Sequence, residues 1–353
     1  MMTMRKHSLR GLRGLASSVL VLVAMPVNSE STDYTEVPLS ELVKLDIYAP
    51  SVLRSHLHEK GEWMLGYELM NMSMEGSREG TEPVSNQDVL QQFMVTPTHM
   101  SMDMQMFHLM YAPSNDLTVM MMLAYLDKSM LHLTQAGGTF QTQSSGLGDV
   151  KISVNQVLSE VETTNGVHRF ALTYGISLPT GSIDEEDFLP AIAANARLPY
   201  PMQLGSGTFD LSIGALYLGY TSKYYWGTQI VATMRTGEND NGYRLGSRIE
   251  LESWVSRAWT DSLSTFVRLS TNHLGNTHGA DPALNPMMVP TADPNRQANT
   301  NVNLHLGLDF NIGIGKADDH TISIEITRPI YQDFDGPQLE TTEIVRISWQ
   351  VVF

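Results

Sequence analysis

Methionine and histidine alternate with other residues along the first third of the chain, in a pattern that could bind soft ligands. From Met100 to Met110 every second residue is Met or His, and the same spacing recurs in residues 70–74 and 120–122. Thioether and imidazole groups are ligands that suit Cu(I). The methionine side chain is also flexible and polarisable, so it suits apolar or aromatic guests. The residues that share this pattern are Met70, Met72, Met74, Met100, Met102, Met104, Met106, His108, Met120 and Met122.

Three interpretations of these methionines stay open. They are ordinary apolar filler, or they line a passage for apolar solutes, or they bind copper, the only cofactor that the sequence suggests. A strand places alternate side chains on one face, but it does not force their sulfur atoms to converge on one ion. The candidate metal ligands are Met102, Met104, Met106 and His108, with His56 and His58 as upstream donors.

A spacing of two residues is typical of β-strands rather than helices. The alternating segments are each close to the roughly 9–11 residues that a tilted membrane strand needs. The connections between them are alternately short and long, as are the periplasmic turns and external loops of outer-membrane barrels. The sequence therefore predicts an all-β fold, an antiparallel transmembrane β-barrel of about twelve strands. The segments are 63–74, 100–111, 117–130, 148–158, 168–179, 208–220, 224–235, 243–258, 263–272, 301–311, 320–330 and 343–353.

Both ends of the chain carry signals of export to the bacterial outer membrane. Residues 1–29 join four basic residues to an apolar run at 15–27, which is typical of a cleaved signal peptide and too short to span a bilayer. The last segment alternates down to a terminal aromatic residue, Phe353, and resembles the signal read by the barrel assembly machinery. We expect residues 63–353 to form the barrel and residues 30–62 to form a periplasmic or lumen-inserted segment.

Composition excludes several classes of function. The chain has no cysteine, so it has no disulfide, no thiolate metal site and no cysteine nucleophile. Its net charge of −16 argues against nucleic acid as a partner, because that binding rests on basic side chains that neutralise phosphates. No stretch after the signal is long and apolar enough for a transmembrane helix, so a membrane protein with this sequence must be a closed barrel in contact with outer-membrane lipid.

The predicted lumen has two kinds of wall. In the later segments we expect charged residues inside, because a charge that faces lipid at mid-depth costs about 2–4 kcal/mol. In the early segments we prefer the methionines inside, because the opposite face carries aromatic residues such as Trp63 and Phe107; the reverse assignment would bury Asp103 and Gln105. Whether the charges select solutes or only fill the barrel stays open. The charged lumen residues are Arg244, Arg248, Glu250, Arg268, His305, Asp309 and Arg346, together with Glu252 and Glu325.

Two short motifs resemble those of a known family. Gly146-Leu147-Gly148-Asp149 opens one segment, and Leu178-Pro179-Thr180-Gly181 closes another. Glycine permits tight backbone at a strand start, and proline ends strand pairing. In these residues the chain resembles the outer-membrane transporters named for the meta-pathway of phenol degradation. The resemblance covers residues 60–353 and implies an outer-membrane barrel that passes hydrophobic or aromatic compounds, but the methionine-rich first third departs from the family pattern.

These observations predict a barrel, not an enzyme, through which small apolar or aromatic solutes pass passively. Soft-metal binding or transport by the lumenal Met and His residues is the alternative. An outer-membrane hydrolase is a remote alternative, because the sequence has no G-x-S-x-G elbow. Whether the lumen is open, or is plugged by residues 75–99, 180–207 or 273–300, stays open.

Overall fold

The computed structural model describes residues 57–353, except residues 165, 191–192 and 314–318. These residues belong to the second of two compact units, Pro38–Phe353. The predicted signal peptide, most of the segment 30–62 and the candidate ligand His56 lie outside the described residues. Within the described part of the chain, no helix has the length and apolar character needed to cross a membrane.

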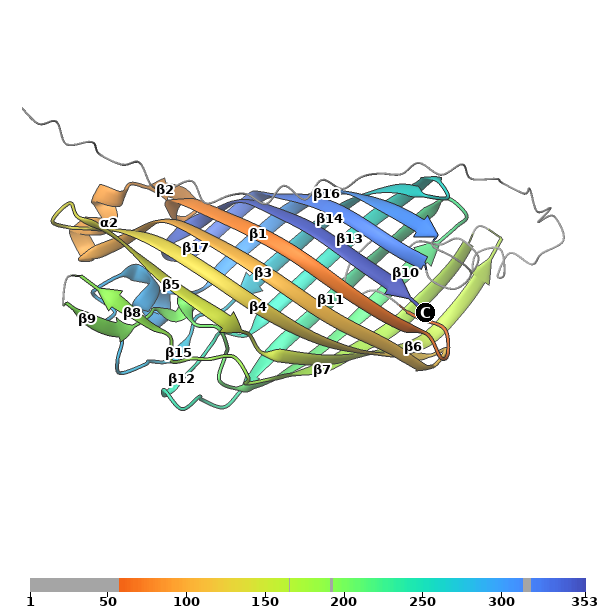
Figure 1. Cartoon of the computed structure of the whole chain (residues 1–353), viewed down its shortest axis with the longest axis horizontal. Coiled ribbons are helices and arrows are strands. Elements are labelled where there is room, and N and C mark those ends of the chain that lie inside the picture. The colour runs from red at the N-terminus through yellow and green to blue at the C-terminus, as the bar shows by residue number, and fades with distance from the viewer. Residues whose placement is uncertain (1–56, 165, 191–192, 314–318) are drawn as a thin grey trace, which may run out of the picture. The chain divides into compact units, whose positions relative to one another are not determined.

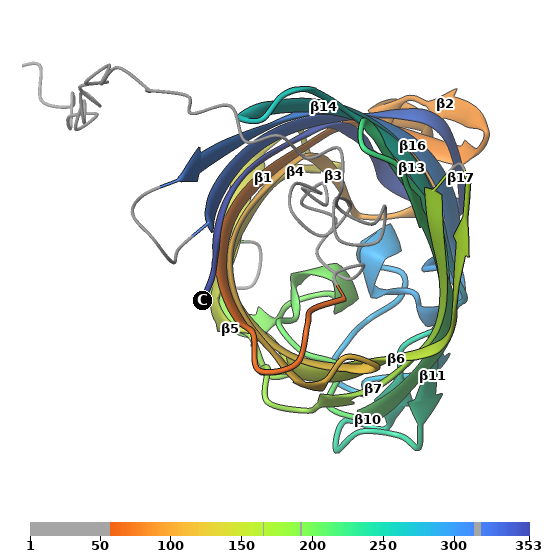
Figure 2. The ribbon, with the colours of Figure 1, turned by 90° about the vertical axis from the view of Figure 1, so that its right-hand side faces the viewer.

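The described residues form a closed antiparallel β-sheet, which confirms the predicted barrel (Figure 1, Figure 2). Eleven strands follow one another round the wall, and β1 pairs with β17 to close the sheet. The wall strands are β1 (Trp63–Gly80), β3 (Val95–Ser114), β4 (Leu117–Thr134), β6 (Val150–Thr163), β7 (Gly166–Leu178), β10 (Phe209–Tyr220), β11 (Tyr224–Thr236), β13 (Arg248–Thr260), β14 (Leu263–Leu274), β16 (Asn299–Gly313) and β17 (Asp319–Val352).

Strand β17 is 34 residues long and reverses direction within its length. Its part up to Phe334 pairs antiparallel with β16, and its part after Phe334 pairs antiparallel with β1. Round the sheet from β1 to β16 there are nine antiparallel strand pairings, and each pairing reverses the strand direction. Strands β1 and β16 therefore run in opposite directions, and one straight strand could not pair antiparallel with both. The stacked rings of His320 and Trp349 join the two arms. Counting each arm of β17 separately, the wall has twelve spans.

Strand β5 (Thr139–Leu147) and β6 form one span with a break between them. Strand β4 pairs with β5 along its later part and with β6 along its first part, and Gly148 and Asp149 fill the break. The expected long loop at 131–147 is therefore wrong. Paired backbone continues through it to a tight turn, in which Gly137 adopts a positive φ of 85°.

The two ends of the barrel differ. At the turn end short connections join the strands, and Trp63 and Phe353 exchange two backbone hydrogen bonds there. At the loop end, on the left of Figure 1, the other connections carry the remaining elements. Most connections at the loop end are longer than the turns, as the sequence predicts, and the tight turn between β4 and β5 is an exception. The loop-end elements are β2 (Glu82–Val84), α2 (Asn86–Gln92), β8 (Glu186–Leu189), β9 (Ala194–Arg197), η1 (Tyr200–Met202), β12 (Tyr243–Arg244), β15 (His278–Gly279), η2 (Pro290–Ala292) and η3 (Pro294–Arg296).

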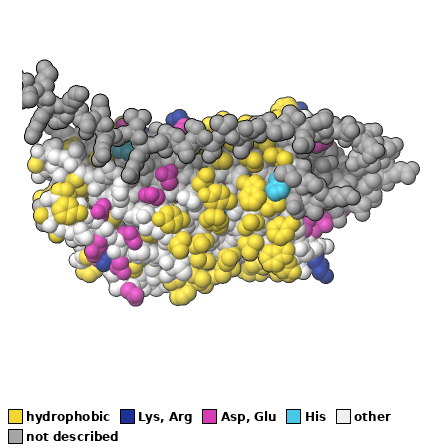
Figure 3. Space-filling model, in the orientation of Figure 1, with side chains coloured by type: hydrophobic (Ala, Val, Ile, Leu, Met, Phe, Trp, Pro, Cys, Tyr) yellow, Lys and Arg dark blue, Asp and Glu magenta, His cyan; other side chains and the backbone are white. Residues whose placement is uncertain are grey.

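The outer face of the wall is apolar. On β10, Leu211 and Ile213 are 45% and 49% exposed, whereas Asp210 beside them is 1% exposed because it faces inward. Figure 3 shows the apolar side chains gathered in a broad band across the strands. Soluble monomers rarely expose so much contiguous apolar surface, so the band faces lipid.

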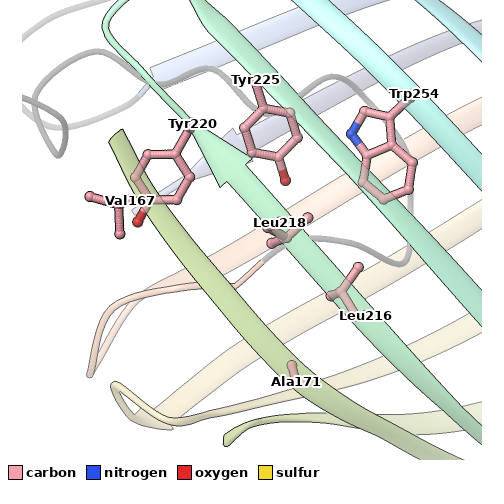
Figure 4. Packing of buried hydrophobic residues seen from close by; sticks show 7 residues of the cluster. All are labelled: Val167, Ala171, Leu216, Leu218, Tyr220, Tyr225 and Trp254. Carbon is pink, nitrogen blue, oxygen red and sulfur yellow. The ribbon is translucent and has the colours of Figure 1, made fainter. Parts of the chain in front are cut away.

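Toward the turn end, the inner face carries a cluster of apolar and aromatic side chains (Figure 4). It comes from β7, β10, β11 and β13, and the side chain of Leu57, ahead of β1, packs against it. The ring centroids of Tyr225 and Trp254 lie 6.4 Å apart in a stacked arrangement. Apolar side chains therefore cover the inner face of these four strands near the turn end. The cluster consists of Val167, Ala171, Leu216, Leu218, Tyr220, Tyr225 and Trp254.

Aromatic rings on the inner face also cover glycines of the neighbouring strand, and this close packing should be sensitive to an added methyl group. Phe266 lies directly opposite Gly307, and a Cβ on Gly307 would be 2.1 Å from Cζ of that ring. We expect Gly307→Ala to lower the free energy of unfolding by about 1–3 kcal/mol, the usual cost of overpacking. Urea unfolding of the barrel in lipid vesicles measures the change. The control is Gly138→Ala, whose Cβ would meet only Thr134 Oγ1 at 3.4 Å; equal losses in both variants would contradict the expectation.

Candidate functional site

A cavity of about 780 Å³ lies inside the barrel toward the loop end. Every wall strand contributes to its lining, and so do the loops that contain Tyr200 and Thr291. The volume lies within the range of about 300–1,000 Å³ that is typical of small-molecule sites. The cavity is therefore the candidate functional site.

One side of the cavity is built from methionines of β1, β3 and β4, named here the methionine wall. These residues alternate with outward-facing ones, so the structure places their side chains on the inner face. Met70 is 4% exposed and does not reach the surface of the cavity, whereas the other members line the cavity. Met130 belongs to the set although sequence reasoning missed it. The methionine wall comprises Met70, Met72, Met74, Met100, Met102, Met104, Met106, Met120, Met122 and Met130.

The sheet register turns these methionines into rows that cross the strands. Directly opposite residues of an antiparallel pair have Cβ atoms about 4.5–5.5 Å apart, close enough for methionine side chains to touch. The opposed pairs are Met70 with Met104, Met72 with Met102, Met74 with Met100, and Met100 with Met130. The rows give the cavity a continuous thioether surface.

His108 lies on the same inner face of β3, next to the cavity but beneath its surface. It is 2% exposed, and its ring covers Gly66 of β1, where a Cβ would be 1.8 Å from His108 Nε2. Neither ring nitrogen has a hydrogen-bond partner among the described residues. His108 was expected to line the lumen, and it instead packs under the methionines.

A second side of the cavity, which meets the methionine wall at Glu68 of β1, carries a chain of ion pairs, named here the ion-pair chain. Arg268 of β14 binds Glu252 of β13 at 3.1 Å and Glu325 of β17 at 2.6 Å. Arg346, from the second arm of β17, binds the same Glu325 at 2.5 Å and lies 3.4 Å from Glu68 of β1. Because charges buried in a protein need partners, these residues neutralise one another across four strands.

Two expected lumen residues, His305 and Asp309, face inward but are sealed within the wall. His305 is 3% exposed, and its ring nitrogens lie 2.8 Å from Ser270 Oγ and 3.0 Å from an Arg268 nitrogen. Asp309 is fully buried and accepts a hydrogen bond from Ser323. Both side chains therefore support the wall rather than line the cavity, which corrects the expectation for them.

The expectation that Arg244 lines the lumen is wrong. Arg244 belongs to β12, which pairs with β15 in the loops, and β13 begins only at Arg248. The Asn239 side chain accepts a hydrogen bond from Tyr243 N–H, and Gly242 has a positive φ of 75°. Residues 245–247, between β12 and β13, belong to neither strand, so the predicted strand is interrupted there and Arg244 does not join the wall.

The charges that line the cavity are balanced. Six basic and six acidic side chains belong to the lining, although the whole chain has a net charge of −16. The expected residues Arg248, Glu250, Arg268 and Arg346 are among them. Glu68 is also there, and sequence reasoning missed it. It alternates in phase with the methionines of β1, which is the signal that could have found it.

The connection between β7 and β10, residues 179–208, folds into the barrel, as the green segment inside the ring of strands in Figure 2 shows. Asp149 holds its two ends: Oδ1 accepts from Gly181 N–H at 2.9 Å, and Oδ2 accepts from the N–H and hydroxyl of Ser206 at 2.9 and 2.8 Å. The backbone of Gly205 packs directly against that of Gly181, and a Cβ on Gly205 would lie 2.3 Å from the Gly181 carbonyl oxygen. This close approach of the two loop ends therefore requires glycine at position 205. We name residues 179–208 the inward loop, and these four residues the loop anchor.

The tip of the inward loop rests on the methionine wall. Met202 is 0% exposed and packs with two members of that wall, Met100 and Met130. The Lys128 ammonium donates hydrogen bonds to the carbonyl oxygens of Pro201 and Gln203, at 2.9 and 2.6 Å. The loop is therefore fixed both at its ends and at its tip, and it narrows the loop end of the lumen.

A second connection, between β14 and β16, meets the inward loop. The Tyr200 hydroxyl accepts a hydrogen bond from Asp281 N–H at 3.2 Å, and its ring packs edge-on against Tyr243 at 4.9 Å. Burial raises the pKa of Tyr243 to about 12 and also raises the pKa of Tyr200. Both hydroxyls therefore stay protonated at neutral pH, and this contact between loops does not titrate there.

The five candidate metal ligands that the structure describes do not form one site. His58 lies at the turn end, where its N–H donates to Thr118 Oγ1 at 3.1 Å and its ring lies 3.4 Å from Glu62. His108 and Met102 are six positions apart on β3, about 20 Å along a strand. Among the described residues, no three His, Asp or Glu side chains are grouped so that they could hold a metal ion. The proposed sharing of one ion by His58 and the distant methionines is therefore wrong.

No family model matches this chain, and no curated protein matches it. Its fold is similar to that of the COG4313 outer membrane channel from Pseudomonas putida F1, with a TM-score of 0.59 and 13% identity over 87% of this chain and 100% of that chain. The P. putida toluene transporter TodX aligns with a TM-score of 0.38 and 9% identity over 84% of this chain and 90% of that chain, a likeness too weak to argue from. At these identities the comparison shows the fold alone.

The closed sheet, the apolar outer band and this likeness together show an outer-membrane β-barrel. In such barrels the short turns are periplasmic and the long loops are external, and the termini are periplasmic. The turn end with Trp63 and Phe353 therefore faces the periplasm, and the cavity lies toward the external loops. The chain is a β-barrel of the bacterial outer membrane.

Proposed function

We propose that this barrel passes small, neutral, apolar or aromatic solutes passively across the outer membrane. The observation that carries the proposal is the cavity, in which a methionine wall meets a wall of balanced charge inside a closed barrel. Methionine surfaces adapt to guests of different shape, and each contact between sulfur and an aromatic ring contributes about 0.3–1.5 kcal/mol. Balanced charge creates no strong field that would favour ions of one sign.

We also infer that the chain is a member of the transporter family named for the meta-pathway of phenol degradation. The fold likeness to an outer-membrane channel supports this inference. The two motifs of the resemblance lie far apart in sequence, yet they meet in the loop anchor, where Asp149 binds Gly181. A shared anchor gives both motifs one physical purpose, which is to hold the inward loop in the lumen.

Uptake of a neutral aromatic probe tests the proposed passage. We expect the triple change of Met72, Met102 and Met104 to Gln to reduce toluene uptake about tenfold in cells that express the barrel, since a loss of about 1.4 kcal/mol of contact energy is tenfold. These three side chains are half-buried at the cavity surface. Met287→Gln is the control, because Met287 is 62% exposed in a loop. Unchanged uptake in the triple variant would contradict the proposal.

The proposal gives the chain no catalytic role. A phospholipid hydrolysis assay on the folded barrel tests this part separately. Turnover above that of a heat-unfolded sample would favour the hydrolase alternative over passage.

A further inference from the structure

We propose that the floor of the cavity forms a site for one soft monovalent cation, Cu(I) or Ag(I), made by His108 and Met106 of β3 and Met122 of β4. The starting observation is His108, which is 2% exposed and whose two ring nitrogens have no hydrogen-bond partner among the described residues. An unpaired buried polar group costs about 1–3 kcal/mol. Two such groups on one ring indicate a missing partner, and imidazole is a common metal ligand.

The side chains beside His108 are thioethers. The sheet register places Met122 directly opposite His108, and Met106 precedes His108 by two positions on the same face. Their Cβ atoms are about 5 Å away across the strands and about 7 Å away along the strand. Methionine has three rotatable bonds, so both sulfurs can turn toward a ring nitrogen. One imidazole nitrogen and two thioethers are a donor set that suits Cu(I).

A small residue lies beside these donors, since Ala124 of β4 lies opposite Met106. Gly66 of β1 lies opposite His108, and the absence of a side chain there lets the imidazole ring lie over that strand. Met106 and Met122 line the cavity, whereas His108 lies beneath them. An ion that enters the cavity therefore meets the two sulfurs first and the imidazole behind them.

The surrounding charges suit a single positive ion. Glu68 lies directly opposite Met106 and is 2% exposed, and its Oε1 accepts no hydrogen bond among the described residues. The nearest cation to this carboxylate, Arg346, is shared with Glu325. Lys151 of β6 lies directly opposite Met122, where it is exposed and lines the cavity. Glu68 thus supplies a partly compensated negative charge next to the thioethers.

Methionine is confined to the inner face of the three strands that carry the site. Strands β1, β3 and β4 carry four, five and three inward methionines, whereas Met121 is the one outward methionine of these strands. The outward apolar positions use Leu, Val, Phe, Tyr and Trp instead. If apolar filling were sufficient, leucine would serve on both faces. Methionine differs from leucine in its flexible, unbranched side chain and in its soft donor atom, and the soft donor atom is the property that a metal would use.

The cation site does not depend on the proposed passage of apolar solutes. Changing Met106 and Met122 to Leu keeps volume and apolar character, and such swaps cost little packing energy. The same change removes both sulfur donors. The leucine variants should therefore lose metal binding and keep solute uptake, and toluene uptake by these variants reports on passage alone.

Silver titration of the purified, folded barrel in detergent tests the site, because Ag(I) has soft-ligand chemistry without redox side reactions. We expect one tightly bound Ag(I), together with shifts of the methyl signals of Met106 and Met122 in a methionine-labelled NMR sample. Both His108→Phe, which keeps a ring over Gly66, and the double change Met106→Leu with Met122→Leu should weaken binding at least about tenfold.

The matched control is the double change Met110→Leu with Met120→Leu. These two thioethers are directly opposite each other in the next row toward the turn end, and they are not ligands in the proposed site. Heat-modifiable migration on gels confirms that each variant is folded. Absence of saturable Ag(I) binding, equal weakening in the control, or unchanged binding in His108→Phe would each overturn the proposal.

Discussion

Arg268→Met should lower the free energy of unfolding of the barrel by about 3 kcal/mol, at the low end of the range for breaking a buried ion pair. Arg268 is 7% exposed and joins Glu252 to Glu325 in the ion-pair chain. Without its guanidinium, Glu325 keeps Arg346, the ring of His305 and a hydrogen bond from the Thr327 hydroxyl at 3.4 Å. The loss stays at the low end because Arg346 still compensates part of the charge.

Urea unfolding of the barrel folded into lipid vesicles measures this loss. Arg328→Met is the matched control, since Arg328 binds Glu343 at 2.6 Å but its side chain is 60% exposed. Exposed pairs contribute less than about 1 kcal/mol. A loss in Arg268→Met no larger than in the control would show that the ion-pair chain does not stabilise the wall.

Local alternation was sufficient to predict the architecture of the wall. Inward and outward residues differ in chemistry along each strand, so the period of two predicted where the strands lie and which side chains face the lumen. The inward placement of Met102 and Met104 followed from aromatic residues such as Phe107 on the other face. The same rule applied to β1 would have included Glu68, which lies on the same face as Met70, Met72 and Met74.

Contacts that depend on register or on long loops could not be predicted in the same way. The sequence does not show that His108 meets Met122 and Gly66, because that depends on how β3 aligns with β4 and β1. Arg244 continues the alternation of the following strand, but the break at residues 245–247 and the pairing of β12 with β15 remove it from the wall. The sequence left open whether residues 180–207 enter the lumen, since their position depends on the distant carboxylate of Asp149.

Asp149→Ala should release the inward loop and raise the conductance of the channel. The carboxylate accepts three hydrogen bonds, from Gly181 N–H and from the N–H and hydroxyl of Ser206. Hydrogen bonds to charged groups contribute about 1.5–3 kcal/mol each. A net loss of about 3 kcal/mol would raise the population of the displaced loop roughly 100-fold relative to the wild-type protein. Lys128 still holds the tip, so adding Lys128→Met should increase the effect further.

Single-channel recording in planar bilayers measures the conductance, and limited proteolysis reports whether the loop is exposed. The control is Asp103→Ala, which removes the same charge from the outer face, where Asp103 accepts a hydrogen bond from Asn71 at 2.7 Å. We expect wild-type conductance and protease resistance in that control. In Asp149→Ala we expect cleavage within residues 182–204 to accompany the higher conductance. If both measurements stay at the wild-type level while the barrel remains folded, the loop anchor does not hold the loop. The packing of Met202 against the methionine wall would then have to account for its position.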